Sequence, residues 1–113
     1  MDRSCPVYSL SSRQSFLQLS KTGKRARSRD LSLIYRLDAG QDTINVAYSV
    51  GKKVGKAVVR NKVKRRMRAL VQECSCQMDR GDYLFLVSPR VADVAFADLR
   101  DEVRALLPLK GKT

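Results

Sequence analysis

The clearest pattern in this chain is an apolar residue at every third or fourth position from residue 57 to residue 74. The stripe consists of Val59, Val63, Met67, Leu70 and Cys74. This spacing predicts a helix with one buried face. The side opposite the stripe is polar: it carries Arg60, Asn61, Lys64, Arg65 and Arg68, with Lys62 and Arg66 at its borders.

Two segments before this helix have the character of strands. Residues 31–37, LSLIYRL, are rich in strand-forming side chains, and residues 43–50, TINVAYSV, alternate apolar with smaller or polar positions. The residues between them, DAGQD, form a typical turn sequence. We therefore expect these two strands to form a hairpin, with Tyr48 facing the core.

Shorter segments predict two further helices and one further strand. A first helix is expected from a cap at Ser11 or Ser12 to about Ser20, closed by Gly23. Residues 83–88, YLFLVS, predict a buried strand that Pro89 stops, with Tyr83 in the core. Residues 94–107 place Phe96, Leu99, Val103 and Leu106 on one side of a last helix.

This order of elements predicts an α+β sandwich, with helices packed on a small, mainly antiparallel sheet. At 113 residues the chain has room for one core, so we expect a single domain over 1–113. The core would cover about residues 9–107, with mobile termini before Val7 and after Pro108.

Positive charge is concentrated in the first part of the chain. The net charge is +12 overall; residues 1–68 hold 17 Lys and Arg against four Asp and Glu, and residues 69–113 hold six against seven. Two clusters supply most of it: residues 52–68, with nine basic residues and no acid, and residues 21–29, KTGKRARSR. We interpret the second cluster as a flexible basic loop, with Lys21, Lys24, Arg25, Arg27 and Arg29 as its cations.

Such a charge is typical of a chain that binds a polyanion. Basic residues at i and i+4 on one helix face, such as Arg60 and Lys64, repel one another unless an anion lies between them. Arginine can grip a phosphate with two hydrogen bonds. Glycines at 51 and 55 frame the lysines before the helix, but the segment lacks the spacing of a nucleotide-binding loop. Nucleic acid phosphate is therefore the expected target.

Several kinds of chemistry are disfavoured. The chain has no histidine, which excludes imidazole as a base or metal ligand. Its three cysteines, Cys5, Cys74 and Cys76, are odd in number and badly spaced for zinc, so we expect small buried thiols. Asp98, Asp101 and Glu102 share one side of the last helix, which we interpret as a charged outer face. No apolar run is long enough to cross a membrane, and we expect a cytoplasmic protein without a membrane partner.

The segment Ser49 to Arg68, SVGKKVGKAVVRNKVKRRMR, resembles the signature stretch of the bacterial ribonuclease P protein subunit. The flanking segments agree over about residues 9 to 107. The resemblance implies a protein that binds a catalytic RNA and helps it to remove the 5′ leader of precursor tRNA. Magnesium ions held mainly by the RNA would do the chemistry, so the protein itself would hold no cofactor and no catalytic residue. No obligate protein partner is expected.

The resemblance also implies roles for individual residues. The RNA-facing set comprises Lys52, Lys53, Lys56, Arg60, Asn61, Lys62, Lys64, Arg65 and Arg68. The leader would enter a cleft between the first helix and the sheet, for which the candidates are Phe16, Ile34, Tyr35 and Ser49. The family fold further implies a left-handed β-α-β crossover through the basic helix, against the general preference for right-handed crossovers.

This sequence departs from the family pattern at two informative places. Lys62 stands where the family usually has an arginine, which replaces a two-pronged contact with a point charge. Ser20, four residues after Phe16, occupies a position that is often aromatic, so the cleft would stack fewer bases. Two other functions stay open at this stage: a ribosomal or general RNA-binding protein with no catalytic partner, and a nuclease that acts without RNA.

Overall fold

The computed structural model describes residues 5–10 and 13–109. Their helices are α1 (Arg13–Thr22), α2 (Ala57–Cys74) and α3 (Phe96–Leu106). Their strands are β1 (Val7–Ser9), β2 (Lys24–Arg27), β3 (Leu31–Leu37), β4 (Ile44–Val50) and β5 (Gly81–Val87), with short 3-10 turns η1 (Lys52–Val54), η2 (Ser75–Gln77) and η3 (Pro89–Asp93). The cap expected at Ser11 or Ser12, and the outermost residues of both termini, lie outside the described residues.

The strands form one mixed sheet in the order β1-β4-β5-β3-β2. The pairs β2–β3 and β3–β5 are antiparallel, whereas β1–β4 and β4–β5 are parallel. The α+β sandwich is confirmed, with the sheet more evenly mixed than expected. The hairpin between residues 31–37 and 43–50 is wrong, because β5 inserts between β3 and β4. The alternation of side chains predicts the strands, but it does not state which strands are neighbours.

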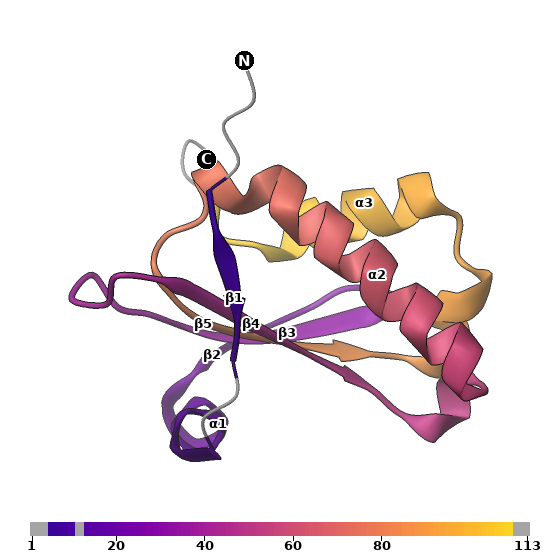
Figure 1. The fold of residues 1–113 in the computed structure, drawn as a ribbon, viewed down its shortest axis with the longest axis horizontal. Coiled ribbons are helices and arrows are strands. Elements are labelled where there is room, and N and C mark those ends of the chain that lie inside the picture. Colours follow the sequence, from indigo (N-terminus) through magenta and orange to yellow (C-terminus); the bar gives the residue numbers. More distant parts are fainter. Residues whose placement is uncertain (1–4, 11–12, 110–113) are drawn as a thin grey trace.

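The helices α2 and α3 cover one face of the sheet, and α1 covers part of the other (Figure 1). The main core fills the space under α2 and α3, where Met67, Tyr83 and Phe85 have no exposed surface. A smaller cluster under α1 contains Leu19 and Ile34. We call these the covered face and the open face of the sheet. Since side chains alternate along a strand, consecutive side chains of β3, β4 and β5 point to opposite faces of the sheet.

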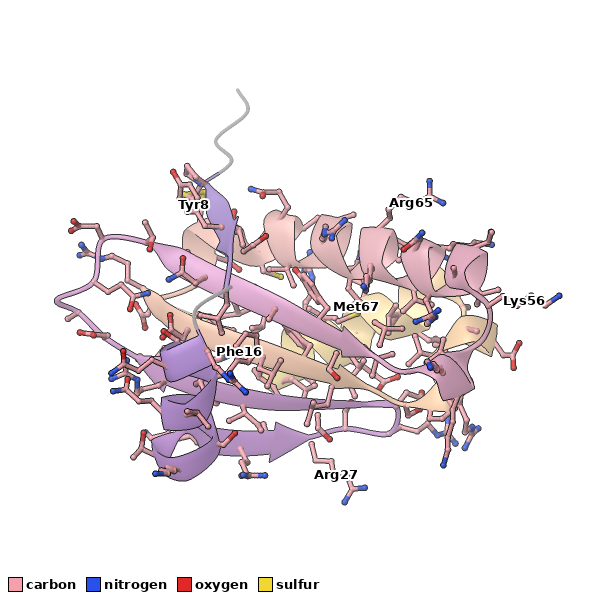
Figure 2. All side chains as sticks on the ribbon, turned by 60° about the horizontal axis from the view of Figure 1, so that its bottom comes forward. Tyr8, Phe16, Arg27, Lys56, Arg65 and Met67 are labelled. Atoms are coloured by element: carbon pink, nitrogen blue, oxygen red, sulfur yellow. A yellow bond between two sulfur atoms is a disulfide. The ribbon has the colours of Figure 1, made fainter. Side chains whose placement is uncertain are left out.

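The connection from β4 through α2 to β5 joins neighbouring parallel strands. In Figure 1, β4 lies in front of β5, both strands run from left to right, and α2 lies above them, which makes the crossover left-handed. Figure 2, seen from a different side, shows the same arrangement. This is the uncommon hand for such a unit, and it agrees with the expectation drawn from the family resemblance.

The segment of residues 5–10 is attached to the rest of the fold, although we expected the chain before Val7 to be mobile. Residues 7–9 form β1 on the edge of β4, and a disulfide joins Cys5 to Cys76 in η2. The amide of Gln72 donates a hydrogen bond to the carbonyl oxygen of Cys5 at 2.9 Å. The expectation of three free thiols is therefore wrong for two of them; Cys74 alone is free and buried. Cys5 and Cys76 are 71 positions apart in sequence, and only the fold brings them together.

Candidate nucleic-acid interface

The basic side of α2 points away from the sheet. The predicted stripe is buried, with Val63 and Met67 at 2% and 0% exposure, because it packs on the covered face. In Figure 2, Met67 points between α2 and the sheet, while Arg65 projects in the opposite direction. Asn61, Lys62, Arg65 and Arg68 are exposed, and Arg60 and Lys64 are half-buried. The helix thus holds its cations on the outside of the molecule.

The loop before α2 extends this charged surface. Lys52 and Lys53 lie in η1, and Lys56 is the residue before the first turn of α2; all three are exposed. Gly55 has φ +148°, and a Cβ there would meet Val59 at 3.1 Å, so the turn into the helix requires glycine. The first N–H groups of α2 have no side-chain cap and carry the positive end of the helix dipole. We call Lys52, Lys53, Lys56 and the polar side of α2 the basic helix surface.

The charges of the basic helix surface are not balanced within the protein. Among residues 5–10 and 13–109, no carboxylate forms an ion pair with any cation of Lys52–Arg68; the ion pairs in that part of the chain involve Arg36, Arg100 and Arg104. The Nε atom of Arg60 is buried and has no hydrogen-bond acceptor among the described residues. Within the described part of the chain, these cations are therefore left without an anionic partner.

The open face carries the second group of expected residues. Phe16 of α1 is half-buried and packs with Leu10, Leu19 and Ile34. Gly23 lets α1 approach β3 closely, since a Cβ there would lie 2.7 Å from a methyl carbon of Ile34. Ser49 is exposed on the same face of the sheet. The structure thus brings Phe16 and Ile34 together, although Ile34 is itself only 6% exposed.

Tyr35 does not belong to this group. Its ring stacks on that of Tyr83 with 6.1 Å between the ring centres, on the covered face. It is the immediate neighbour of Ile34 in β3, so the alternation of the strand sends it to the opposite side. Tyr35 as a cleft residue is therefore wrong. Tyr48 and Tyr83 lie in or against the main core as expected, and burial raises the pKa of both hydroxyls.

The segment expected to be a loop is an edge strand. Lys24–Arg27 pair with β3, with Arg25 opposite Ile34 and Arg27 opposite Ser32. This register puts Arg25 and Arg27 on the open face, while Lys21, Lys24 and Arg29 are exposed around them. Sequence reasoning missed the strand because its side chains are charged at three of four positions. Charge on an edge strand is common, since it prevents pairing with other chains.

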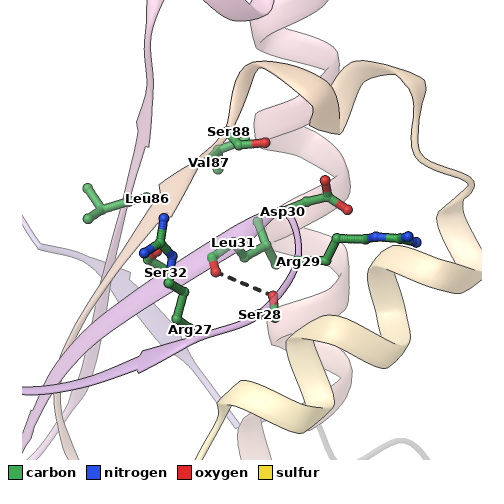
Figure 3. A pocket seen from close by; sticks show the side chains of 9 residues that line it. All are labelled: Arg27, Ser28, Arg29, Asp30, Leu31, Ser32, Leu86, Val87 and Ser88. Carbon is green, nitrogen blue, oxygen red and sulfur yellow. Dashed lines mark hydrogen bonds between the residues drawn. The ribbon is translucent and has the colours of Figure 1, made fainter.

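A groove runs over the open face beside β2. We call it the β2 groove; its lining residues are Arg25, Ala26, Arg27, Ser32, Leu33, Ile34 and Leu86. It continues past Ser32 and Leu86 to the turn at Ser28–Asp30 and to Ser88 (Figure 3). Leu86 is 36% exposed and gives this groove an apolar floor between arginines. Nothing in the sequence singled out Leu86.

The acids of α3 divide into two kinds. Asp98 and Asp101 are exposed, as expected for an outer face. Glu102 departs from that expectation, because it is half-buried and accepts hydrogen bonds from the hydroxyl of Ser28 at 2.5 Å and the N–H of Asp30 at 2.8 Å. Within the described residues, no three His, Cys, Asp or Glu side chains are grouped so that they could hold a metal ion.

Comparison with known proteins identifies the family of this chain. The family model described as Ribonuclease P matches residues 6–109. The chain belongs to the ribonuclease P protein family. A ribonuclease P protein component from Streptococcus pyogenes is 32% identical over 103 residues, which cover 91% of this chain and 86% of that protein.

Solved structures agree with this family. The ribonuclease P protein from Thermotoga maritima superposes with a TM-score of 0.77 at 27% identity, over 88% of this chain and 94% of that chain. The ribonuclease P protein from Staphylococcus aureus shares the fold, with a TM-score of 0.79 at 21% identity, over 88% of this chain and 91% of that chain. None of the described helices of the present chain is long and apolar enough to cross a membrane.

Proposed function

We propose that this chain is the protein subunit of a ribonuclease P ribonucleoprotein. It binds the catalytic RNA and the 5′ leader of precursor tRNA, and it assists removal of the leader in the bacterial cytoplasm. The bond is cut by the RNA with magnesium ions that the RNA mainly holds. The protein contributes binding and charge neutralisation, and the proposal needs no further protein partner.

The observation that carries this proposal is the unbalanced charge of the basic helix surface. Six of its cations, Lys52, Lys53, Lys56, Lys62, Arg65 and Arg68, are exposed, and none has a carboxylate partner in the described part of the chain. Each arginine can hold a phosphate through two hydrogen bonds. A folded RNA presents phosphates from several strands side by side, and cations placed between them reduce their repulsion.

The open face suits a single-stranded leader. An unpaired strand is commonly held by aromatic or apolar side chains under its bases and by cations along its backbone, with about 1 to 3 kcal/mol for each stacked base. Phe16 and Leu86 supply apolar surface, Arg25 and Arg27 supply charge, and Ser49 supplies an exposed hydroxyl. Since Ser20 offers no ring, we expect the stacking to be limited to Phe16.

Reconstitution tests the proposal directly. Cleavage of precursor tRNA is measured at low magnesium with a bacterial ribonuclease P RNA alone, with this protein alone, and with both. We expect leader removal only by the combination, because the protein lowers the magnesium that the RNA needs. Protein that binds the RNA yet leaves cleavage unchanged would indicate a general RNA-binding role. Cleavage by the protein alone would indicate a nuclease, which the absence of histidine makes us not expect.

A further inference from the structure

Two carboxylates meet between the β2–β3 turn and α3. Asp30, at the end of that turn, is only 3% exposed, and its Oδ1 atom has no hydrogen-bond partner among the described residues. Glu102 reaches it from α3: one oxygen of Glu102 accepts the N–H of Asp30 at 2.8 Å and the hydroxyl of Ser28 at 2.5 Å. The turn is held in place by the N–H of Ser88, which donates to the carbonyl oxygen of Asp30 at 3.0 Å.

The two side chains influence each other's ionisation. Burial, and then the contact with Glu102, raise the pKa of Asp30. For Glu102, burial opposes ionisation, but the hydrogen bonds from Ser28 and Asp30 outweigh it and lower the pKa. Two adjacent carboxylates need either a shared proton or a cation between them. Either a proton carried by Oδ1 of Asp30 or a cation bound at that oxygen would supply the partner that this buried atom lacks.

The surroundings favour a cation. A hollow opens beside the pair, and the residues that line it include Asp93, Asp98 and Asp101. Two cations also line it, Arg29 and Arg90, so negative charges outnumber positive ones by five to two. This is a local reversal in a protein whose overall net charge is +12.

We propose that Asp30 and Glu102 together hold one hydrated divalent cation, with Mg²⁺ as the preferred ion, in the hollow between the β2–β3 turn and α3. Mg²⁺ commonly binds through one or two carboxylates and keeps several waters, so this site does not need a third protein ligand, and none is found among the described residues. Oδ1 of Asp30 gains its missing partner, and waters on the ion reach the exposed Asp98 and Asp101. The ion then ties the β2–β3 turn, and with it the end of the β2 groove, to α3. This inference does not depend on the proposed function.

Amide NMR of the full isotope-labelled chain, without RNA, tests the site. MgCl₂ is titrated at neutral pH, and a trace of MnCl₂ is then added to reveal nearby amides by paramagnetic broadening. We expect saturable shifts at millimolar Mg²⁺, with Mn²⁺ broadening residues 28–31 and 98–102 first. Asp30→Asn and Glu102→Gln each remove the saturable shift. The matched control Glu73→Gln, which alters an exposed carboxylate already paired with Arg100, keeps it.

Other outcomes overturn the proposal. A native chain that shows no saturable shift, but whose Asp30 and Glu102 signals titrate together with pH, holds a shared proton instead of an ion. Broadening spread evenly over the acidic residues shows that the hollow attracts cations without a site. If Asp30→Asn does not fold, the double variant Asp98→Asn with Asp101→Asn replaces it. Removal of these outer carboxylates must weaken Mg²⁺ binding, so unchanged binding refutes the site.

Discussion

Replacement of Arg65 by glutamine tests whether the basic helix surface binds RNA phosphate. Arg65 is exposed and projects away from the sheet, and it forms no ion pair with a described residue, so the substitution leaves the packing of α2 unchanged. Glutamine has a helix propensity close to that of arginine and keeps a polar, though shorter, side chain without the charge. We therefore expect an unchanged thermal midpoint and weaker binding of ribonuclease P RNA.

The size of the effect follows from the release of counterions. Each phosphate that a cation neutralises contributes about 0.9 to the steepness of log K against log salt on a B-form duplex, and about 0.7 on a single strand; we use the duplex value for the folded RNA. Six exposed cations would give the native chain a slope of about −5. Arg65→Gln removes one contact, so the slope becomes shallower by about 0.9 and binding weakens by about 15-fold at about 50 mM salt but only about 4-fold at about 200 mM.

The assay is a filter-binding or fluorescence-anisotropy titration at several salt concentrations, with circular dichroism as a check on folding. The matched control is Arg80→Gln, which removes another exposed arginine, just before β5 and remote from Lys52–Lys56. We expect no change of slope in the control. If Arg65→Gln and Arg80→Gln shift the slope equally, only the net charge matters and the basic helix surface is not the binding site.

Four further predictions concern the fold and the open face. Val63→Asp places an unpaired charge at a position that is 2% exposed. The cost is several kcal/mol in a domain whose whole free energy of unfolding is about 5 to 15 kcal/mol. Circular dichroism should therefore show an unfolded chain, and a stable helix would refute the orientation of α2. Reduction of the Cys5–Cys76 disulfide should lower the thermal midpoint. The length of the closed loop sets an upper bound of about 4 kcal/mol on the loss of unfolding free energy. An equal midpoint with and without reductant would show that the bond does not constrain the unfolded chain. Phe16→Ala should weaken binding of precursor tRNA by about 1 to 3 kcal/mol while binding of mature tRNA is unaffected; equal losses for both substrates would remove the leader from this face. Because the pKa of Tyr83 is raised in the folded chain, its contribution to stability is complete below the pKa of about 10 in the unfolded chain and is lost as the pH rises further; urea unfolding at alkaline pH should show this loss, and Tyr83→Phe should reduce it.

The features that sequence alone predicted are those that a local repeat determines. The stripe from Val59 to Cys74 predicts both the helix and its buried side, because a helix turns through a constant angle for each residue. The opposite side then has to be exposed, so the same repeat also indicates which residues of α2 can reach a partner. The strands β3, β4 and β5 follow in the same way from alternation and strand-forming side chains.

The tertiary structure decided what depends on distant segments. β5 separates β3 from β4, and no local pattern marks that insertion. The charged segment Lys24–Arg27 is a strand because β3 offers it an unpaired edge, and Tyr35 is a core residue because the register of β3 gives the open face to Ile34.

The same holds for pairs that meet only in the folded chain. Cys5 reaches Cys76 because β1 lies beside β4, near the end of α2, and Glu102 reaches Asp30 because α3 packs over the β2–β3 turn. A side chain's own neighbours in sequence determine whether it lies on a helix or a strand. Which partners it meets depends on how segments far apart in the chain bury their apolar faces together, and that is a property of the whole core.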